Sequence, residues 1–197
     1  MSADKLSAVD DVIAQMIADE KIVGSVVAVA RHGKVCYLKA QGQRDTEPAD
    51  AMQTDTIFRI YSMTKAIVTA GALVLVDDGV INIDDPVTNY IPELEALRVQ
   101  EGDELVPLTK PITVADLMRH TAGFTYGFGD DAIDQLFHKH EPLAAKDLTE
   151  MAQRLTHIPL RNQPGEKWVY SVSIDMLGLV IERATGQPLD AFLEEQI

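Results

Sequence analysis

Ser62 and Lys65 stand three residues apart at the start of an apolar stretch that runs to Val76. On a helix this spacing places the hydroxyl and the amine on one face. A serine hydroxyl becomes a nucleophile when a neighbour takes its proton, and a lysine can do so if its surroundings lower its pKa towards neutrality. The positive end of the helix would favour negative charge on the attacking oxygen. The pair therefore indicates covalent catalysis at Ser62.

A Ser-x-x-Lys tetrapeptide by itself does not identify a site. A second copy begins at Ser2, close to the N-terminus, and we assign it no role. The alternative interpretation makes Ser62 a helix cap and Lys65 a solvated side chain. Lys65, however, precedes the apolar run Ala66-Ile67-Val68, where an ammonium group is costly unless it is paired or neutral.

Three sequence segments, taken together, resemble the class C β-lactamase and penicillin-binding-protein-like superfamily of serine hydrolases, and most closely its family VIII carboxylesterase branch. They occur in the order of the superfamily and are Phe58-Arg59-Ile60-Tyr61-Ser62-Met63-Thr64-Lys65, Leu117-Met118-Arg119-His120-Thr121-Ala122-Gly123-Phe124 and Pro164-Gly165 through Trp168-Val169-Tyr170-Ser171. The pairs Asp77-Asp78 and Asp84-Asp85, which follow the first segment, resemble the residues that follow this motif in the superfamily.

The resemblance implies a serine hydrolase that cleaves small or medium carboxylic esters without a metal or cofactor. Ser62 would attack the carbonyl, Lys65 would accept its proton, and Tyr170 would lie near both and pass a proton to the leaving alkoxide. The residues that the resemblance places beside the substrate are Tyr61, Phe124, Trp168 and Val172. His138 and His140 lack further ligands at metal-binding spacing, so we interpret them as solvated.

Two departures from the family pattern leave alternatives open. β-Lactamases of this group usually carry Tyr-x-Asn at the second motif, but Val172 occupies the asparagine position and cannot hydrogen-bond a lactam side chain. This favours ester cleavage over a β-lactamase or a D-amino-acid peptidase, whereas an acyltransferase stays open as an alternative. The third motif, on a strand that lines the pocket, has no counterpart before Ile197. The chain could therefore be a non-catalytic binding module, or a second chain or bound fragment could supply the C-terminal strands.

Composition limits the other classes of function. The net charge of −14 with no cluster of Lys or Arg argues against nucleic acid and anionic membranes as partners. Cys36, the single cysteine, lies in an apolar run and is interpreted as a small buried thiol. Residues 1–24 contain no long apolar run, so we expect neither a signal peptide nor a membrane span. We therefore expect a cytoplasmic location.

The predicted elements give a mixed α/β protein of the β-lactamase and transpeptidase type, an antiparallel sheet flanked by helices plus a mostly helical lobe. Residues 1–60 would form the first helix and strands of the α/β domain, with a hairpin turning at His32-Gly33. Residues 61–170 would form the helical lobe with the catalytic motifs, including a short helix capped by Thr113 and Asp116. Residues 171–197, with a helix capped by Ser173, would begin the return to an incomplete α/β domain.

Overall fold

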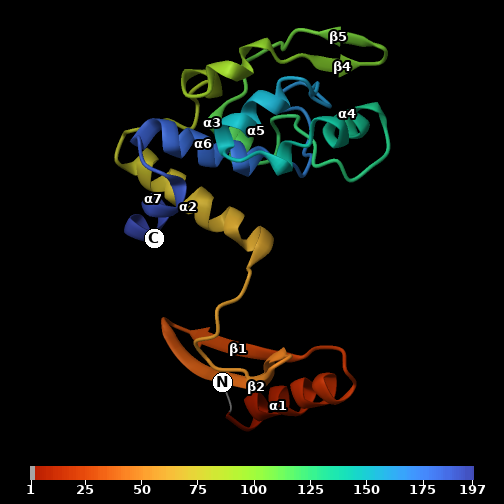
Figure 1. Ribbon diagram of the computed structural model, residues 1–197. Helices are drawn as coiled ribbons and strands as arrows, with labels where there is room; N and C mark the ends of the chain where they lie inside the picture. Colours follow the sequence, from red (N-terminus) through yellow and green to blue (C-terminus); the bar gives the residue numbers. More distant parts are fainter. Residues whose placement is uncertain (1–2) are drawn as a thin grey trace. The chain divides into compact units, whose positions relative to one another are not determined.

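The computed structural model describes residues 3–197, with side chains from Lys5 onward. Ser2 of the second tetrapeptide lies outside the described residues. The chain folds as two compact units, residues 1–60 and residues 61–197 (Figure 1). Residues 171–197 belong to the same unit as residues 61–170, and their first helix packs against the helices of that unit.

The first unit is a helix on an antiparallel sheet. Helix α1 spans Ala3–Ala18, and the sheet has the order β1-β2-β3 with strands Gly24–Arg31, Lys34–Thr46 and Ala49–Ala51. The turn between β1 and β2 has positive φ angles at both His32 and Gly33. A two-residue hairpin turn needs these angles if its twist is to match the twist of the flanking strands. Asp10 fixes α1 to β2: its carboxylate pairs with Lys39 at 2.7 Å and accepts a hydrogen bond from Tyr37.

Strand β2 continues through the polar residues after Ala40 to Thr46 and pairs with β3. The prediction of a buried thiol is wrong, because Cys36 is exposed; its sulfur lies 3.3 Å from the carbonyl oxygen of Val29.

The second unit is mainly helical. Its α-helices are α2 (Thr64–Asp77), α3 (Val114–Met118), α4 (Ala132–His140), α5 (Leu148–Leu155), α6 (Ser173–Thr185) and α7 (Leu189–Gln196). Short 3-10 turns cover Tyr61–Met63, Val87–Asn89, Pro92–Ala96 and Pro142–Ala144. Strands β4 (Val99–Glu101) and β5 (Glu104–Val106) form a small antiparallel hairpin.

Helix α6 is the centre of this unit. Eight of its residues are buried, and it packs against α2, α3, α5 and α7. Burial of its apolar side chains stabilises the unit. Gly186, in the left-handed region, ends it, and its N-cap is Val172 and not the predicted Ser173. The capping box of Thr113 and Asp116 at the start of α3 is confirmed.

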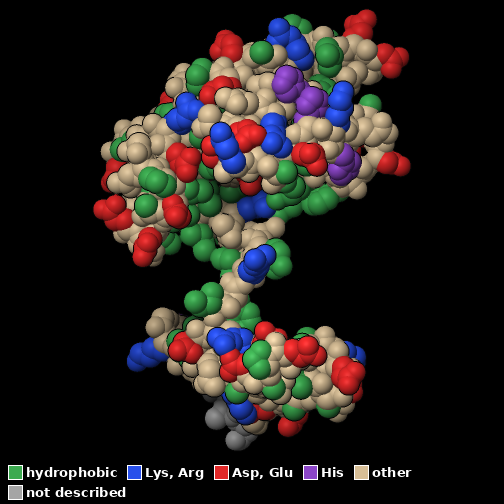
Figure 2. Space-filling model, in the orientation of Figure 1, with side chains coloured by type: hydrophobic (Ala, Val, Ile, Leu, Met, Phe, Trp, Pro, Cys, Tyr) green, Lys and Arg blue, Asp and Glu red, His purple; other side chains and the backbone are tan. Residues whose placement is uncertain are grey.

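The surface is charged on both units. On the face shown in Figure 2, acidic side chains are dispersed among basic ones. None of the helices that the structure describes is long and apolar enough to cross a membrane.

Candidate active site

Ser62 lies in the 3-10 turn that leads into α2, and Lys65 lies one turn further along. The Nζ atom of Lys65 is 3.4 Å from the Oγ atom of Ser62. The residue before the serine, Tyr61, has a φ of +46°, a left-handed conformation that is costly for a tyrosine. The backbone is therefore strained immediately before Ser62, at the start of the turn that leads into α2.

Tyr170 reaches the same serine from the segment before α6. Its hydroxyl donates a hydrogen bond of 2.7 Å to the Oγ of Ser62, and its ring lies under the Lys65 ammonium, 5.0 Å from ring centroid to Nζ. The structure thus brings together all three predicted catalytic residues, two of them from α2 and its turn and one from a segment that is distant in the sequence.

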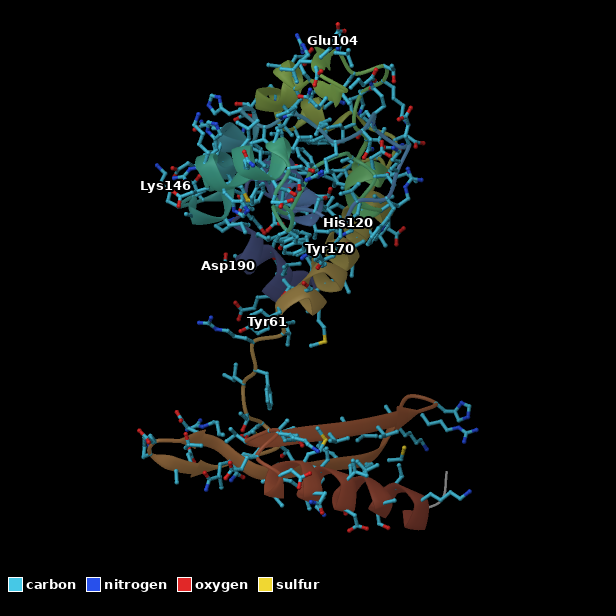
Figure 3. The ribbon with its side chains drawn as sticks, turned by 90° about the vertical axis from the view of Figure 1, so that its right-hand side faces the viewer. Tyr61, Glu104, His120, Lys146, Tyr170 and Asp190 are labelled. Carbon is cyan, nitrogen blue, oxygen red and sulfur yellow. The ribbon has the colours of Figure 1, made fainter. Side chains whose placement is uncertain are left out.

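His120 holds the segment that carries Tyr170. Its backbone carbonyl accepts from the N–H of Val169 at 2.9 Å, and its Nδ1 accepts from the N–H of Ser171 at 3.2 Å. Its ring also packs on the ring of Tyr170, with centroids 4.8 Å apart, and Figure 3 shows the two side chains beside each other. Burial, together with the charge of Lys65, lowers the pKa of His120, so the ring is neutral and its Nδ1 is free to accept.

Tyr126 is a functional candidate that the sequence did not reveal. Its hydroxyl is 3.5 Å from the Nζ of Lys65, and its ring stacks on Tyr170 at 5.5 Å with planes 9° apart. It also stacks on the ring of Phe128, with centroids 4.9 Å apart. Lys65 therefore stands beside two stacked phenol rings.

The loop that carries Tyr126 is fixed by a buried carboxylate. Asp134 accepts from the hydroxyl of Thr125 at 2.6 Å and from the N–H of Gly129 at 2.9 Å, and it pairs with Arg161 at 2.5 Å. A side chain at Gly127 would meet the ring of Phe137 at 2.6 Å, so the loop also needs a glycine there.

The electrostatics of the site differ from the sequence-based expectation. Burial lowers the pKa of Lys65, but its hydrogen bonds with Tyr170 and Tyr126 outweigh burial and leave the pKa above its ordinary value. The hydrogen bonds of Tyr170 with Ser62 and Lys65 lower the pKa of Tyr170. These shifts favour the ammonium form of Lys65 and the ionised form of Tyr170.

A pocket of about 340 Å³ opens beside this cluster. Its walls combine the polar atoms of the cluster with apolar side chains, and the lining residues are Tyr61, Ser62, Thr64, Lys65, Val68, Tyr126, Leu148, Ile174, Asp175 and Leu189. A larger concavity of about 710 Å³ lies in the first unit, between α1 and the sheet, but it contains neither a serine nor a lysine. We therefore place the chemistry at the smaller pocket.

The four residues expected beside the substrate have different positions. Tyr61 lines the pocket and is exposed, and Trp168 is exposed with its ring 6.2 Å from that of Tyr170. Phe124 and Val172 are only 3% and 0% exposed and belong to the core. We therefore correct their assignment: both side chains lie in the hydrophobic core of the second unit and offer no surface to a substrate.

Metal-binding clusters do not occur in the described part of the chain, where no three His, Cys, Asp or Glu side chains converge. His140 stacks instead on His157, with ring centroids 4.9 Å apart.

The sequence and fold of this chain are similar to those of known proteins. Esterase EstB of Burkholderia gladioli is 40% identical over 197 residues, which cover 98% of this chain and 49% of EstB. The structure of EstCE1, described as a hydrolase with promiscuous acyltransferase activity, matches with a TM-score of 0.86 and 31% identity over 96% of this chain and 49% of that one. A class C β-lactamase, at 22% identity and a TM-score of 0.74 over 98% of this chain and 48% of that one, shares the fold.

This chain spans about half the length of the relatives it matches. Within that span the family model described as Beta-lactamase matches residues 9–197, nearly the whole sequence. The chain therefore belongs to the beta-lactamase family of penicillin-binding-protein-like serine hydrolases, with the mixed α/β fold of that family.

Proposed function

We propose that this protein is a serine carboxylesterase that forms an acyl intermediate on Ser62. The observation that carries the proposal is the convergence of three groups: the Oγ of Ser62, the Tyr170 hydroxyl at 2.7 Å and the Lys65 ammonium at 3.4 Å. The similarity to an esterase at 40% identity supports the same reaction class.

The reaction begins with the transfer of the Ser62 proton to the Tyr170 oxygen. The ionised form of Tyr170 is favoured by the adjacent Lys65 ammonium, and Ser62 then bonds to the ester carbonyl carbon. As the tetrahedral intermediate collapses, the carbon–oxygen bond to the alcohol breaks, and Tyr170 returns the proton to the departing alkoxide. The alcohol leaves, and the acyl group stays on Ser62.

Water completes the cycle by the reverse sequence. Tyr170 accepts a proton from the water, the hydroxide attacks the acyl carbon, and Ser62 recovers its proton as the carboxylic acid leaves. If an alcohol replaces the water, the same steps give acyl transfer. The acyltransferase activity named for EstCE1 makes this the second candidate function.

Labelling with a fluorophosphonate tests the nucleophile. The reagent bonds to an activated serine oxygen with loss of fluoride, and intact-mass analysis counts the adducts. We expect one adduct on the protein and none on Ser62→Ala, with Ser7→Ala as a control for a serine of the first unit. A folded protein that gives no adduct, or an adduct that persists in Ser62→Ala, would contradict the proposal.

Substrate comparison tests the reaction class. We expect hydrolysis of a short-chain nitrophenyl ester and little turnover of a chromogenic cephalosporin, because Val172 is buried and presents no amide to a lactam side chain. Faster turnover of the cephalosporin would favour a β-lactamase instead.

The second chain or bound fragment that was expected to supply further strands stays a prediction. Full esterase activity in a sample whose mass spectrum shows only the 21.6 kDa species would contradict it. The cytoplasmic location, and the exclusion of nucleic acid and membranes as partners, stay predictions.

A further inference from the structure

Two hollows border the catalytic residues, and different catalytic residues line each of them. The Ser62 pocket, the pocket of about 340 Å³ described above, has Ser62 and Lys65 in its wall but not Tyr170. A second hollow of about 400 Å³, which we call the Tyr170 hollow, has Tyr170 in its wall but neither Ser62 nor Lys65. Its lining residues are Thr125, Tyr126, Phe128, Gly129, Asp131, Asp134, Arg161, Val169 and Tyr170. Tyr126, whose ring stacks on Tyr170, belongs to both linings.

The proposed reaction assigns a different part of an ester to each side of the cluster. The acyl carbon bonds to the Oγ of Ser62, so the acyl chain starts next to that atom. Tyr170 returns the proton to the departing alcohol oxygen, and a general acid must lie within hydrogen-bond reach of the atom that it protonates. The alcohol group therefore extends from the Tyr170 side. Because the two side-chain oxygens are 2.7 Å apart, one ester can reach both hollows.

An exposed aromatic ring forms part of the Tyr170 hollow. Phe128 is 77% exposed. Its ring plane lies 6° from that of Tyr126, which in turn lies 9° from that of Tyr170, so the three rings are nearly parallel. Aromatic groups pack favourably on such a surface, in offset-stacked or edge-to-face arrangements. The hollow thus offers an aromatic contact to whatever group lies beside Tyr170.

The loop holds the Phe128 ring in place before a ligand binds. On one side of it, the N–H of Gly127 donates to the hydroxyl of Thr125 at 3.2 Å. On the other side, the N–H of Gly129 donates to the carboxylate of Asp134 at 2.9 Å, and the same carboxylate accepts from Thr125 at 2.6 Å. A ring fixed in this way costs little further entropy when a ligand packs on it.

The charges of the Tyr170 hollow favour a neutral ligand group. Arg161 is the cation of the lining, and it pairs with Asp131 at 2.6 Å and with Asp134 at 2.5 Å. Its guanidinium is thus occupied by two carboxylates and is not available to an anion. One positive and two negative charges disfavour an anionic alcohol group. The rings of Tyr126 and Phe128 suit a neutral aromatic one.

Aliphatic side chains line the Ser62 pocket beside its polar groups. They are Val68, Leu148, Ile174 and Leu189. Leu148 and Leu189 are only partly buried and pack against the core. A side chain at Gly178 would meet Leu189 at 2.9 Å and Leu148 at 3.3 Å, so both leucines cover this point of α6. Such a wall suits an aliphatic acyl chain.

We propose that the ester is divided between the two hollows: an aliphatic acyl chain lies in the Ser62 pocket against Leu148 and Leu189, and a neutral aromatic alcohol group lies in the Tyr170 hollow against Phe128. This inference rests on the proposed function and names the substrate class of the same site, arylmethyl esters of aliphatic acids. Phe128 then selects the alcohol, and the two leucines select the acyl chain.

A crossed set of esters tests the division. Ethyl and benzyl esters of acetic and hexanoic acid vary one part of the substrate at a time, and titration of the released acid gives kcat/KM for each. In Phe128→Ala the preference for benzyl over ethyl should fall by about two- to tenfold, the contribution of one aromatic contact, and the acyl preference should stay unchanged. In Leu148→Ala, which enlarges the Ser62 pocket, the acyl preference should shift towards hexanoate and the alcohol preference should stay unchanged.

Matched variants control for general effects of the substitutions. Phe128→Tyr keeps the ring and should keep the preference for benzyl esters. Leu105→Ala removes an exposed leucine of β5, outside both linings, and should change neither preference. If thermal unfolding shows that Leu148→Ala is not folded, Leu189→Ala tests the same wall. Unchanged preferences in both test variants, or a loss of the benzyl preference in the leucine variant alone, overturn the proposal.

Binding of the alcohol alone separates this inference from the proposed function. Ser62→Ala has no nucleophile, and saturation-transfer NMR detects benzyl alcohol bound to it. We expect the transfer to be lost when Phe128→Ala is added and kept when Leu148→Ala is added. If this pattern is found and the parent protein hydrolyses no ester, the Tyr170 hollow still binds an aromatic alcohol and the esterase function fails. If the parent protein hydrolyses esters and neither the kinetic nor the NMR pattern is found, the esterase function stands and the division fails.

Discussion

The hydroxyl of Tyr170 lies 2.7 Å from the Oγ of Ser62, although 108 residues separate them in the sequence. His120 accounts for much of this closeness, since it hydrogen-bonds both Val169 and Ser171 and packs on the tyrosine ring between them. The position of the phenol is thus set by its neighbours and not by Ser62. The hydroxyl itself can therefore be removed with little disturbance of the site.

Tyr170→Phe should keep the fold and remove the proton acceptor. The ring stack with Tyr126 and the contact with His120 need no hydroxyl, so we expect thermal stability close to that of the parent protein. The rate of fluorophosphonate labelling should fall by about 100- to 10,000-fold, the usual contribution of a general base. Tyr37→Phe, which removes a phenol hydroxyl from the first unit, is the control. An unchanged labelling rate in Tyr170→Phe would show that another group accepts the proton.

The pH dependence of labelling should report the ionisation of Tyr170. Its hydrogen bonds with Ser62 and Lys65 lower its pKa, so the phenolate that accepts the Ser62 proton forms below the ordinary value of 10.0. The labelling rate should rise as the pH passes through this lowered pKa. The inflection should be absent from Tyr170→Phe, and an inflection that persists there would assign the titration to another residue.

The sequence predicted the features that depend on neighbouring residues. The hairpin at His32-Gly33 and the capping box of Thr113 and Asp116 were both recognisable, because turn and cap chemistry is local. The β4–β5 hairpin was missed because its strands are three residues long and carry charged residues, which leaves no alternating pattern to detect.

The site was predictable only in part, for a related physical reason. The motif spacing identified Ser62, Lys65 and Tyr170, but Tyr126 has no motif of its own and is recognisable only by its contacts with distant residues. The expected fall in the pKa of Lys65 was based on its apolar sequence neighbours alone. The two phenols that raise the pKa come from other parts of the chain.

Tyr126 should contribute to catalysis mainly through its ring. Tyr126→Phe removes the hydroxyl 3.5 Å from Lys65 but keeps the stack on Tyr170, so we expect a fall in labelling rate of less than about tenfold, as for one long hydrogen bond. Tyr126→Ala also removes the ring 5.2 Å from the ammonium and should lower the rate further. Equal rates in the two variants would show that the ring itself contributes nothing.

Asp116 should stabilise the second unit in a way that depends on pH. Its side chain, 1% exposed, accepts hydrogen bonds from the hydroxyls of Thr113 and Thr121 and pairs with Arg119. Burial raises the pKa of Asp116, but these hydrogen bonds outweigh burial and leave the pKa below 3.8. Asp116→Asn should therefore lower the free energy of unfolding near neutral pH by about 1–3 kcal/mol.

The sign of the pH dependence follows from the lowered pKa. The ionised carboxylate contributes its full stability above the unfolded value of 3.8, and this stability is lost as the pH falls through the lower pKa of the folded state. Urea unfolding at several pH values should show a constant difference between the parent protein and Asp116→Asn near neutral pH, and a narrowing difference below pH 3.8. Asp103→Asn, an exposed carboxylate in the β4–β5 turn, should show no such difference. If the Asp116→Asn difference stayed constant into acid, the stabilisation would come from packing and not from the charge.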